Sequence, residues 1–305
     1  MSSRRTTRVL AAASALTVFA LGAAACSSGD KPSNPSAASS ASDKVKVVAS
    51  TDVWGSVVSA IGGDKVQVTS IIHDPSADPH SYETTADDAL AAKNAKLTLA
   101  NGGGYDKFFD KLAGQAAGAK KLVAYDIAAT GNENEHVWYD LPGVGKIADQ
   151  VAAGLGEIQP ASKQTFDDNA KAFKGKIDEL VKKATEIGTA HPDTKVVATE
   201  PVARYLLQTA KVTDATPEEF SKAVENESDV PAAALDQFRK LITGKQVKAL
   251  VNNVQTETPV TKQVVADAKG AGVAVVDVAE TLPAGVTDYI GWMSKTVDTL
   301  AGAVK

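Results

Sequence analysis

Apolar residues along this chain are grouped in short β-rich runs that alternate with amphipathic stretches. Residues 45–48 begin a β-rich run, 53–61 have a helical pattern that stops at Gly62-Gly63, and 66–72 form a second strand. Strands that alternate with helices indicate βαβ units and a mostly parallel sheet. The same reading predicts helices at 85–92, 202–210, 260–268 and 289–304, and strands at 97–99, 195–198, 247–251 and 273–278.

The middle of the chain carries one long helical stripe. Pro160 is well placed to open a helix, and the pattern ends near Gly188. Such a helix would be roughly 40 Å long, enough to brace two lobes, although the stripe alone is equally compatible with a long surface helix. We therefore predict two α/β halves, residues 45–158 and 190–305, that flank a helix at 159–189. The stripe consists of Phe166, Ala170, Phe173, Ile177, Leu180, Ala184 and Ile187.

The first 44 residues are predicted to lie outside the fold. Three arginines precede an apolar run at 9–25, which is typical of a signal peptide at 1–25. Cys26, the sole cysteine, follows small residues as in a bacterial lipobox, although Ala23 stands where that motif usually has leucine. Lipidation at Cys26 would leave the Ser-, Ala- and Pro-rich residues 26–44 as a flexible tether. The alternative is a plain secreted protein with an unpaired cysteine.

Composition removes several classes of function. A hydrophobic content of 44% is enough for a real core, and a net charge of −5 argues against broad nucleic-acid binding. The histidines form no H-E-x-x-H pair, and no G-x-S-x-G or P-loop motif occurs. The glycine-rich run at 101–104 is interpreted as a tight turn after a strand rather than a phosphate site.

Two of the four histidines stand in loops with unusual neighbours. His80 lies in the segment D-P-H-S-Y-E after a predicted strand, and His136 lies in E-H-V-W-Y-D just before a helix with Pro142 in its first turn. Ligands of open α/β sheets bind at the carboxyl ends of strands, so both positions suit a ligand residue. From the residues alone, each histidine could be a metal ligand or an ordinary hydrogen-bonded side chain.

The two segments together carry a family resemblance. The first resembles the D-P-H-x-Y-E/Q segment of the zinc/manganese solute-binding proteins of ABC importers, and the second resembles the H-x-W-x-D segment of that family. Residues 96–104 resemble its strand followed by Asn-Gly, and the resemblance extends over 45–305. It implies two α/β lobes with mostly parallel sheets, joined by one long rigid helix.

The resemblance also implies a four-residue metal site made by His80, His136, Glu200 and Glu280. Glu200 matches the third ligand, at a strand end in the second lobe, although it could instead cap the following helix. Glu280 matches the fourth, acidic ligand, with Asp277 as its close rival. The two other histidines, His73 and His191, are expected to be peripheral.

The function implied is binding, with no catalysis. The chain would be an extracytoplasmic, lipid-anchored monomer that binds one Mn²⁺ or Zn²⁺ between its lobes and delivers it to an ABC permease driven by an ATPase. Two imidazoles and two carboxylates disfavour Cu⁺ and suit Mn, Zn or Fe²⁺, and the glutamate in place of a third histidine favours Mn²⁺ slightly. The alternatives are a secreted zinc hydrolase and a surface adhesin or metal-sensing lipoprotein.

Overall fold

The computed structural model of the chain describes residues 44–305 apart from 76, 78, 80, 81, 132, 133 and 227. The predicted signal peptide, Cys26, nearly all of the predicted tether, and His80 lie outside the described residues. Within the described part of the chain, no helix combines the length and the apolar character that crossing a membrane requires.

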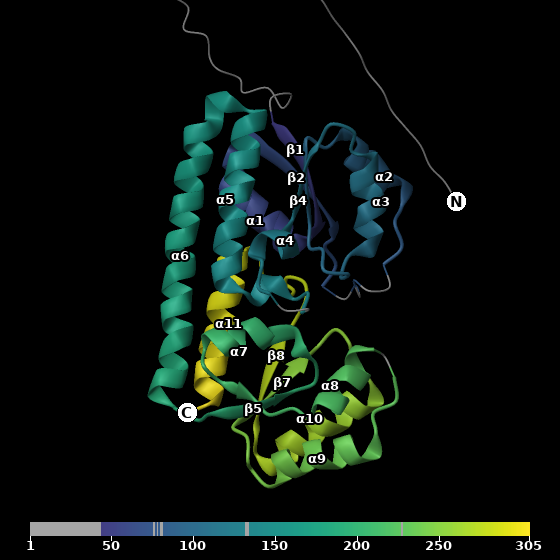
Figure 1. Ribbon diagram of the computed structural model, residues 1–305, viewed down its shortest axis with the longest axis vertical. Helices are drawn as coiled ribbons and strands as arrows, with labels where there is room; N and C mark the ends of the chain where they lie inside the picture. The colour runs from purple at the N-terminus through teal and green to yellow at the C-terminus, as the bar shows by residue number, and fades with distance from the viewer. Residues whose placement is uncertain (1–43, 76, 78, 80–81, 132–133, 227) are drawn as a thin grey trace, which may run out of the picture. The chain divides into compact units, whose positions relative to one another are not determined.

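The first half of the fold is built on a four-stranded sheet of order β2-β1-β3-β4, in which every pairing is parallel. Helices cover both faces of this sheet (Figure 1). Its strands are β1 (Val45–Thr51), β2 (Val66–Ile72), β3 (Leu97–Ala100) and β4 (Lys120–Val123). Its helices are α1 (Asp52–Gly62), α2 (Ala86–Asn94), α3 (Lys107–Gln115), α4 (Ala124–Ala128) and α5 (Leu141–Ile158), with short 3₁₀ turns η1 (Gly63–Lys65) and η3 (Val137–Tyr139).

Side chains of β1 show why both faces of the sheet are covered. Val47 and Ala49 point into the core that contains α1 and α5, whereas Val48 points to the opposite face, towards Phe109 of α3 and Ala92 of α2. Successive residues of a strand face opposite sides, so the consecutive apolar residues 47–49 are buried on both faces of the sheet. The continuous apolar run at the start of the fold therefore specifies a central strand.

A second parallel sheet of order β6-β5-β7-β8 organises the other half (Figure 1). Val196 and Val251 face the same core as α6 and α11, and Val197 and Leu250 face a second core with α8, α9 and α10. The strands are β5 (Lys195–Ala198), β6 (Thr213–Asp214), β7 (Ala249–Asn253) and β8 (Ala274–Val278). The helices are α7 (Arg204–Thr209), α8 (Glu218–Glu225), α9 (Ala232–Thr243), α10 (Pro259–Ala271) and α11 (Tyr289–Ala303), with the 3₁₀ turn η5 (Pro201–Ala203) before α7.

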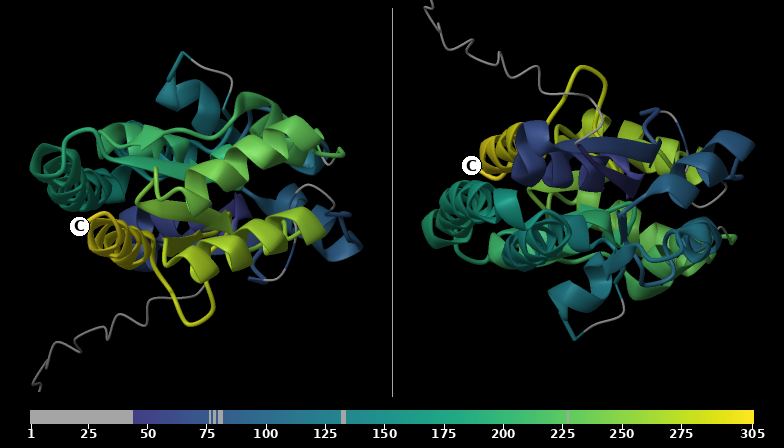
Figure 2. Two further views of the ribbon diagram at one scale, coloured as in Figure 1. Left: turned by 90° about the horizontal axis from the view of Figure 1, so that it is seen from below. Right: turned by 90° about the horizontal axis from the view of Figure 1, so that it is seen from above.

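The long helix α6 (Lys163–Ala190) follows the 3₁₀ turn η4 (Pro160–Ser162) and runs past both sheets (Figure 1). It packs beside α5 and α11, and the views along its length show these three helices together at one side of the sheets (Figure 2). All seven residues of the predicted stripe are buried. The prediction of two α/β halves joined by one long helix is confirmed.

Candidate metal centre

Direct hydrogen bonds connect residues at the carboxyl ends of one parallel sheet to residues at the carboxyl ends of the other. Asp52, which follows β1, accepts a bond from the backbone N–H of Leu282, which follows β8, with N···Oδ1 at 3.1 Å. Gln255, which follows β7, donates from Nε2 to the carbonyl of Pro75 beyond β2, at 3.2 Å. Because ligands of open α/β sheets bind at the carboxyl ends of the strands, this junction is where a ligand site is expected.

Two buried glutamates meet at this junction. Glu200 follows β5 and is 8% exposed, and Glu280 follows β8 and is 1% exposed. The Nδ2 atom of Asn253, at the end of β7, donates to Glu200 Oε2 at 2.7 Å and to Glu280 Oε1 at 2.8 Å. Since one nitrogen contacts both acceptors, the two carboxylates lie within about 6 Å of each other. Buried acids this close concentrate negative charge in the way that a cation site requires.

The sequence left open whether Glu200 is a ligand or a helix cap, and whether Glu280 or Asp277 is the fourth ligand. Glu200 precedes the turn η5 and makes no side-chain cap bond there, while its carboxylate accepts hydrogen bonds from Asn253 and from the hydroxyl of Thr256. Asp277 is exposed and accepts a bond from Asn252 Nδ2 at 3.0 Å. The structure thus brings Glu280, and not Asp277, next to Glu200.

His136 is 3% exposed, and its ring stands edge-on to that of Trp138, with the centroids 5.1 Å apart. Asn134 Oδ1 accepts the backbone N–H of His136 at 3.0 Å and faces the ring atom Nδ1 at 3.2 Å. Asn134 Nδ2 donates to the carbonyl of Pro201 at 3.0 Å. A backbone N–H can only donate and a carbonyl can only accept, so the orientation of the Asn134 amide is fixed. Nδ1 of His136 therefore carries the proton, and Nε2 keeps the lone pair that a metal ion needs.

The segment that contains His136 is hydrogen-bonded to the residues next to both glutamates in the chain. Asn134 bonds to Pro201, which directly follows Glu200. The Tyr139 hydroxyl donates to the carbonyl of Ala279, which directly precedes Glu280, at 3.0 Å, and accepts the N–H of Ala279 at 3.3 Å. Burial raises the pKa of Tyr139 above its ordinary value, so the hydroxyl keeps the proton that it donates. His136, Glu200 and Glu280 are thereby held in one hydrogen-bonded frame.

The glycine-rich turn after β3 is hydrogen-bonded to the residue that precedes His136. Asn101 Nδ2 donates to the carbonyl of Glu135 at 2.9 Å, next to His136. The Asp106 carboxylate accepts the N–H groups of Asn101 and Gly102 at 2.6 and 2.8 Å, and Gly102 has a φ of 80°. Left-handed backbone of this kind favours glycine. The run forms the tight turn that the sequence predicts, and the N–H groups of Asn101 and Gly102 are bonded within the protein.

The frame does not form a complete metal cage by itself. Among the residues that the structure describes, no three His, Cys, Asp or Glu side chains are grouped closely enough to hold a metal ion. His80, predicted as a further ligand, lies outside those residues. The other histidines are peripheral to the frame: His73 is exposed, and His191 lies before β5, at the opposite end of that strand from Glu200.

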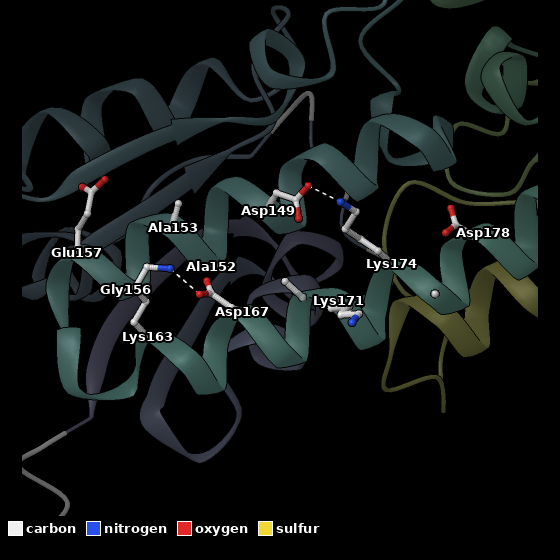
Figure 3. Close-up of a pocket in the computed structure, with 12 residues that line it drawn as sticks. Asp149, Ala152, Ala153, Gly156, Glu157, Lys163, Asp167, Lys171, Lys174 and Asp178 are labelled. Atoms are coloured by element: carbon white, nitrogen blue, oxygen red, sulfur yellow. Dashed lines mark hydrogen bonds and ion pairs between the residues drawn. The ribbon is translucent and has the colours of Figure 1, made fainter.

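A hollow with a volume of about 830 Å³ lies between α5 and α6, away from the two glutamates (Figure 3). Four of its charged side chains pair with one another: Lys174 bonds to Asp149 and Lys163 to Asp167, each at 2.5 Å. All four of these side chains are largely exposed. Charges that neutralise each other in solvent offer little to a metal ion, so we assign the chemistry to the buried carboxylates.

Comparison with known proteins agrees with this fold. The family model described as zinc-uptake complex component A, periplasmic, matches residues 47–303. The chain belongs to this family. Its curated relatives are named as substrate-binding lipoproteins of metal ABC transporters, not as enzymes.

Individual relatives of this zinc-uptake family differ in the metal for which they are named. The manganese ABC transporter substrate-binding lipoprotein ScaA of Streptococcus gordonii is 28% identical over 238 residues, which cover 72% of this chain and 75% of that protein. The iron ABC transporter substrate-binding lipoprotein MtsA of Streptococcus pyogenes serotype M1 is 27% identical over 223 residues, or 64% of this chain and 72% of MtsA. The solved periplasmic zinc-binding protein TroA of Treponema pallidum superposes with a TM-score of 0.69 at 19% identity, over 86% of this chain and 99% of TroA. That likeness concerns the fold.

Sequence reasoning missed the amide side chains that hold the candidate ligands. Asn134, Asn253 and Gln255 make the bonds that connect the ligand loops. The sequence does contain a signal for Asn253 and Gln255. The mostly polar residues 252–256 directly follow a predicted strand, at the end of the strand where ligands bind.

Proposed function

We propose that this protein is the extracytoplasmic solute-binding component of an ABC importer, and that it binds one divalent transition-metal ion through His80, His136, Glu200 and Glu280. His136 would coordinate through Nε2. The ion is the cargo of the protein, so the side chains have to hold it and later release it. The family and the hydrogen-bonded frame around the two glutamates support this proposal.

The observation that carries the proposal is the bridge from Asn253 to both buried carboxylates. One neutral amide nitrogen satisfies an oxygen of Glu200 and an oxygen of Glu280. Two carboxylates buried this close repel each other, and a cation between them would remove that repulsion. Metal binding would therefore stabilise the fold where two acids otherwise destabilise it.

The donor set favours Mn²⁺ or Zn²⁺ as cargo. Imidazole and carboxylate ligands without a thiolate suit Mn, Fe and Zn ions rather than Cu⁺. A carboxylate in place of a third imidazole makes the site harder and favours Mn²⁺ as the physiological ion, although Zn²⁺ would bind more tightly in direct competition. The relatives named for manganese and iron, and the zinc-uptake family to which the chain belongs, support this range of metals.

The remaining parts of the proposal concern the location and the partners of the chain. We infer a monomer anchored to the outside of the cell membrane through lipid on Cys26, with residues 26–44 as a tether. Its partners would be an integral-membrane permease and the ATPase that drives it. The lipoprotein names of the relatives support the anchor and the transporter.

Titration of the purified, chelator-treated protein with Mn²⁺ and Zn²⁺ tests the proposal. We expect one ion per chain for the wild type, and the loss of binding in the double variant His80→Ala and His136→Ala. Glu280→Gln should weaken binding at least 100-fold, because it removes a charged ligand. Asp277→Asn is the matched control and should bind as the wild type does. Retention of one tightly bound ion by Glu280→Gln, with loss in Asp277→Asn, would assign the fourth ligand to Asp277.

A further inference from the structure

A single glutamine side chain connects the segment that precedes His80 to the backbone of Glu280. Gln255 Oε1 accepts the backbone N–H of Glu280 at 2.5 Å and that of Thr281 at 3.2 Å. Its Nε2 donates to the carbonyls of Pro75 and Ala77 at 3.2 and 3.3 Å. The same Nε2 also donates to the hydroxyl of Thr281 at 2.8 Å. One carboxamide thus bonds to the loop after β8 through both of its polar atoms, and to Pro75 and Ala77 after β2 through Nε2.

The His136 side of the junction is fastened differently. Tyr139 bonds to Ala279, and the Tyr289 hydroxyl donates to the carbonyl of Trp138 at 2.6 Å. The Tyr205 hydroxyl donates to the carbonyl of Asn134, also at 2.6 Å. These bonds are buried and come from three separate elements. Pro75 and Ala77 themselves are bonded to the loops of the second sheet through the side chain of Gln255, and Asp52, at the neighbouring end of β1, accepts the N–H of Leu282.

Gln255 also contacts the bridge between the two carboxylates. Its backbone N–H donates to Asn253 Oδ1 at 3.2 Å, which orients Nδ2 of the same amide towards Glu200 and Glu280. The residue therefore touches both the backbone of one proposed ligand and the amide that spaces the two acids. Loss of its side chain would free the first-sheet segment while leaving the ligand side chains in place.

We propose that Gln255 is a positioning residue that ties Pro75 and Ala77 to the backbone of Glu280 and thereby slows release of the metal ion. This inference rests on the proposed metal site. Gln255 does not coordinate the ion. Its effect is on the rate at which the ion leaves, because these hydrogen bonds have to break before Pro75 and Ala77 can separate from Glu280.

The test is the rate of metal release from Gln255→Met, a substitution of similar length that neither donates nor accepts strongly. Mn²⁺- or Zn²⁺-loaded protein is mixed with excess EDTA in a stopped-flow instrument, and the stoichiometry is measured separately by elemental analysis. Loss of several part-buried hydrogen bonds should speed release about tenfold or more, with one ion per chain retained. Gln237→Met, on the exposed surface of α9, is the matched control and should release as the wild type does.

Hydrogen exchange and a second variant separate positioning from a general loss of structure. Exchange at the amides of Glu280 and Thr281 should accelerate in Gln255→Met, whereas the melting temperature of the metal-free form should stay close to that of the control variant. Gln255→Glu keeps the acceptor for these amides and loses the donor to Pro75 and Ala77. It should also release faster, although its added negative charge near the cation would by itself slow release.

Release within twofold of the wild-type rate in both Gln255 variants would overturn the inference and leave the proposed site intact. A lower melting temperature without faster release would overturn it too, because it would indicate a purely structural role. A wild-type protein that takes up neither Mn²⁺ nor Zn²⁺ would contradict the proposed function itself. The stoichiometry measurement thus distinguishes the two failures.

Discussion

Asparagine side chains orient the candidate ligands on both sides of the junction. Asn134 fixes the proton of His136 on Nδ1, and Asn253 spaces Glu200 from Glu280. In each case the amide has a second bond, to Pro201 or to the N–H of Gln255, that leaves it one orientation. Outer partners of this kind set which ligand atoms are available to a metal, so they matter nearly as much as the ligands.

At the residue scale, the sequence predicted candidate ligands but not the side chains that hold them. His136 and Glu280 stand in short segments with family-specific neighbours, and each is recognisable without a structure. Asn134 and Gln255 act through backbone atoms of residues distant in the chain, such as Pro201 and Pro75. Any residue has a carbonyl, so no residue type in the sequence marks such partners.

Asp52 gives a pH-dependent prediction at the same scale. Burial, the largest influence, raises the pKa of this carboxyl from 3.8 to about 6, although the N–H of Leu282 partly opposes the shift. Between these pH values the folded protein holds a proton that the unfolded chain has released, so stability falls as the pH rises through this window. Above about pH 6 the ionised Asp52 costs about 1–2 kcal/mol, after a discount for its partial exposure.

Asp52→Asn should remove this cost, because the amide oxygen can still accept the N–H of Leu282. In urea denaturation with EDTA present, we expect the variant to exceed the wild type in stability by about 1 kcal/mol at pH 7.5, and by less at pH 4.5. The difference between the two proteins isolates Asp52 from the other acids. The same stability difference at both pH values would contradict the assigned pKa.

Among the elements, α6 was the most predictable. Its apolar side chains repeat at steps of three and four over many turns, so the pattern identifies the helix independently of its surroundings. The helix predicted at 202–210 begins instead as the 3₁₀ turn η5, and α7 spans only Arg204–Thr209. Pro201 explains part of that difference, because proline has no N–H and stands at the first turn.

Other elements escaped the sequence reading for physical reasons. β4 has only four residues, with burial concentrated at Leu122, so no periodicity can develop. The helices α8 and α9 bury few positions each, Phe220 and Phe238 among them, and their stacked rings pack 4.1 Å apart. Contacts between two short helices are tertiary facts that a window on one segment cannot reveal.

The stripe of α6 supports a stability prediction at the element scale. Ile177 is 2% exposed, and truncation to alanine should lower the free energy of unfolding by about 2–5 kcal/mol through lost burial and a residual cavity. Glu179, two residues along the same helix, is exposed, and Glu179→Ala should change stability by about 0.5 kcal/mol at most. Denaturant unfolding of both variants makes the comparison. Equal effects would mean that the stripe is not a packing surface.

For residues 44–305 as a whole, one core connects the two sheets. Val47 and Leu99 of the first sheet belong to the same buried cluster as Val196 and Val251 of the second, and the buried stripe of α6 is part of that cluster. A shared core resists large relative motion of the halves, since packed interiors do not deform continuously. Exchange of the metal ion is therefore expected at the loops, where Gln255 makes its contacts.

The fold at this scale followed from sequence, since alternating strands and helices permit few arrangements other than parallel sheets with helices on both faces. The sequence did not predict that the carboxyl ends of the two sheets lie next to each other. It depends on bonds such as Asp52 to Leu282 and Tyr139 to Ala279, which join positions far apart in the chain. Before the structure, only the family resemblance predicted that candidate ligands from the two halves belong to one site.

Anomalous diffraction from crystals of the Mn²⁺- or Zn²⁺-loaded protein tests the central claim most directly. Data collected at the absorption edge of the metal locate the ion without reference to any ligand assignment. The account predicts one strong peak within about 2.0–2.3 Å of His136 Nε2 and of carboxylate oxygens of Glu200 and Glu280, with His80 completing the shell. A peak at Asp277, or in the groove between α5 and α6, without one between the two buried glutamates, would contradict it.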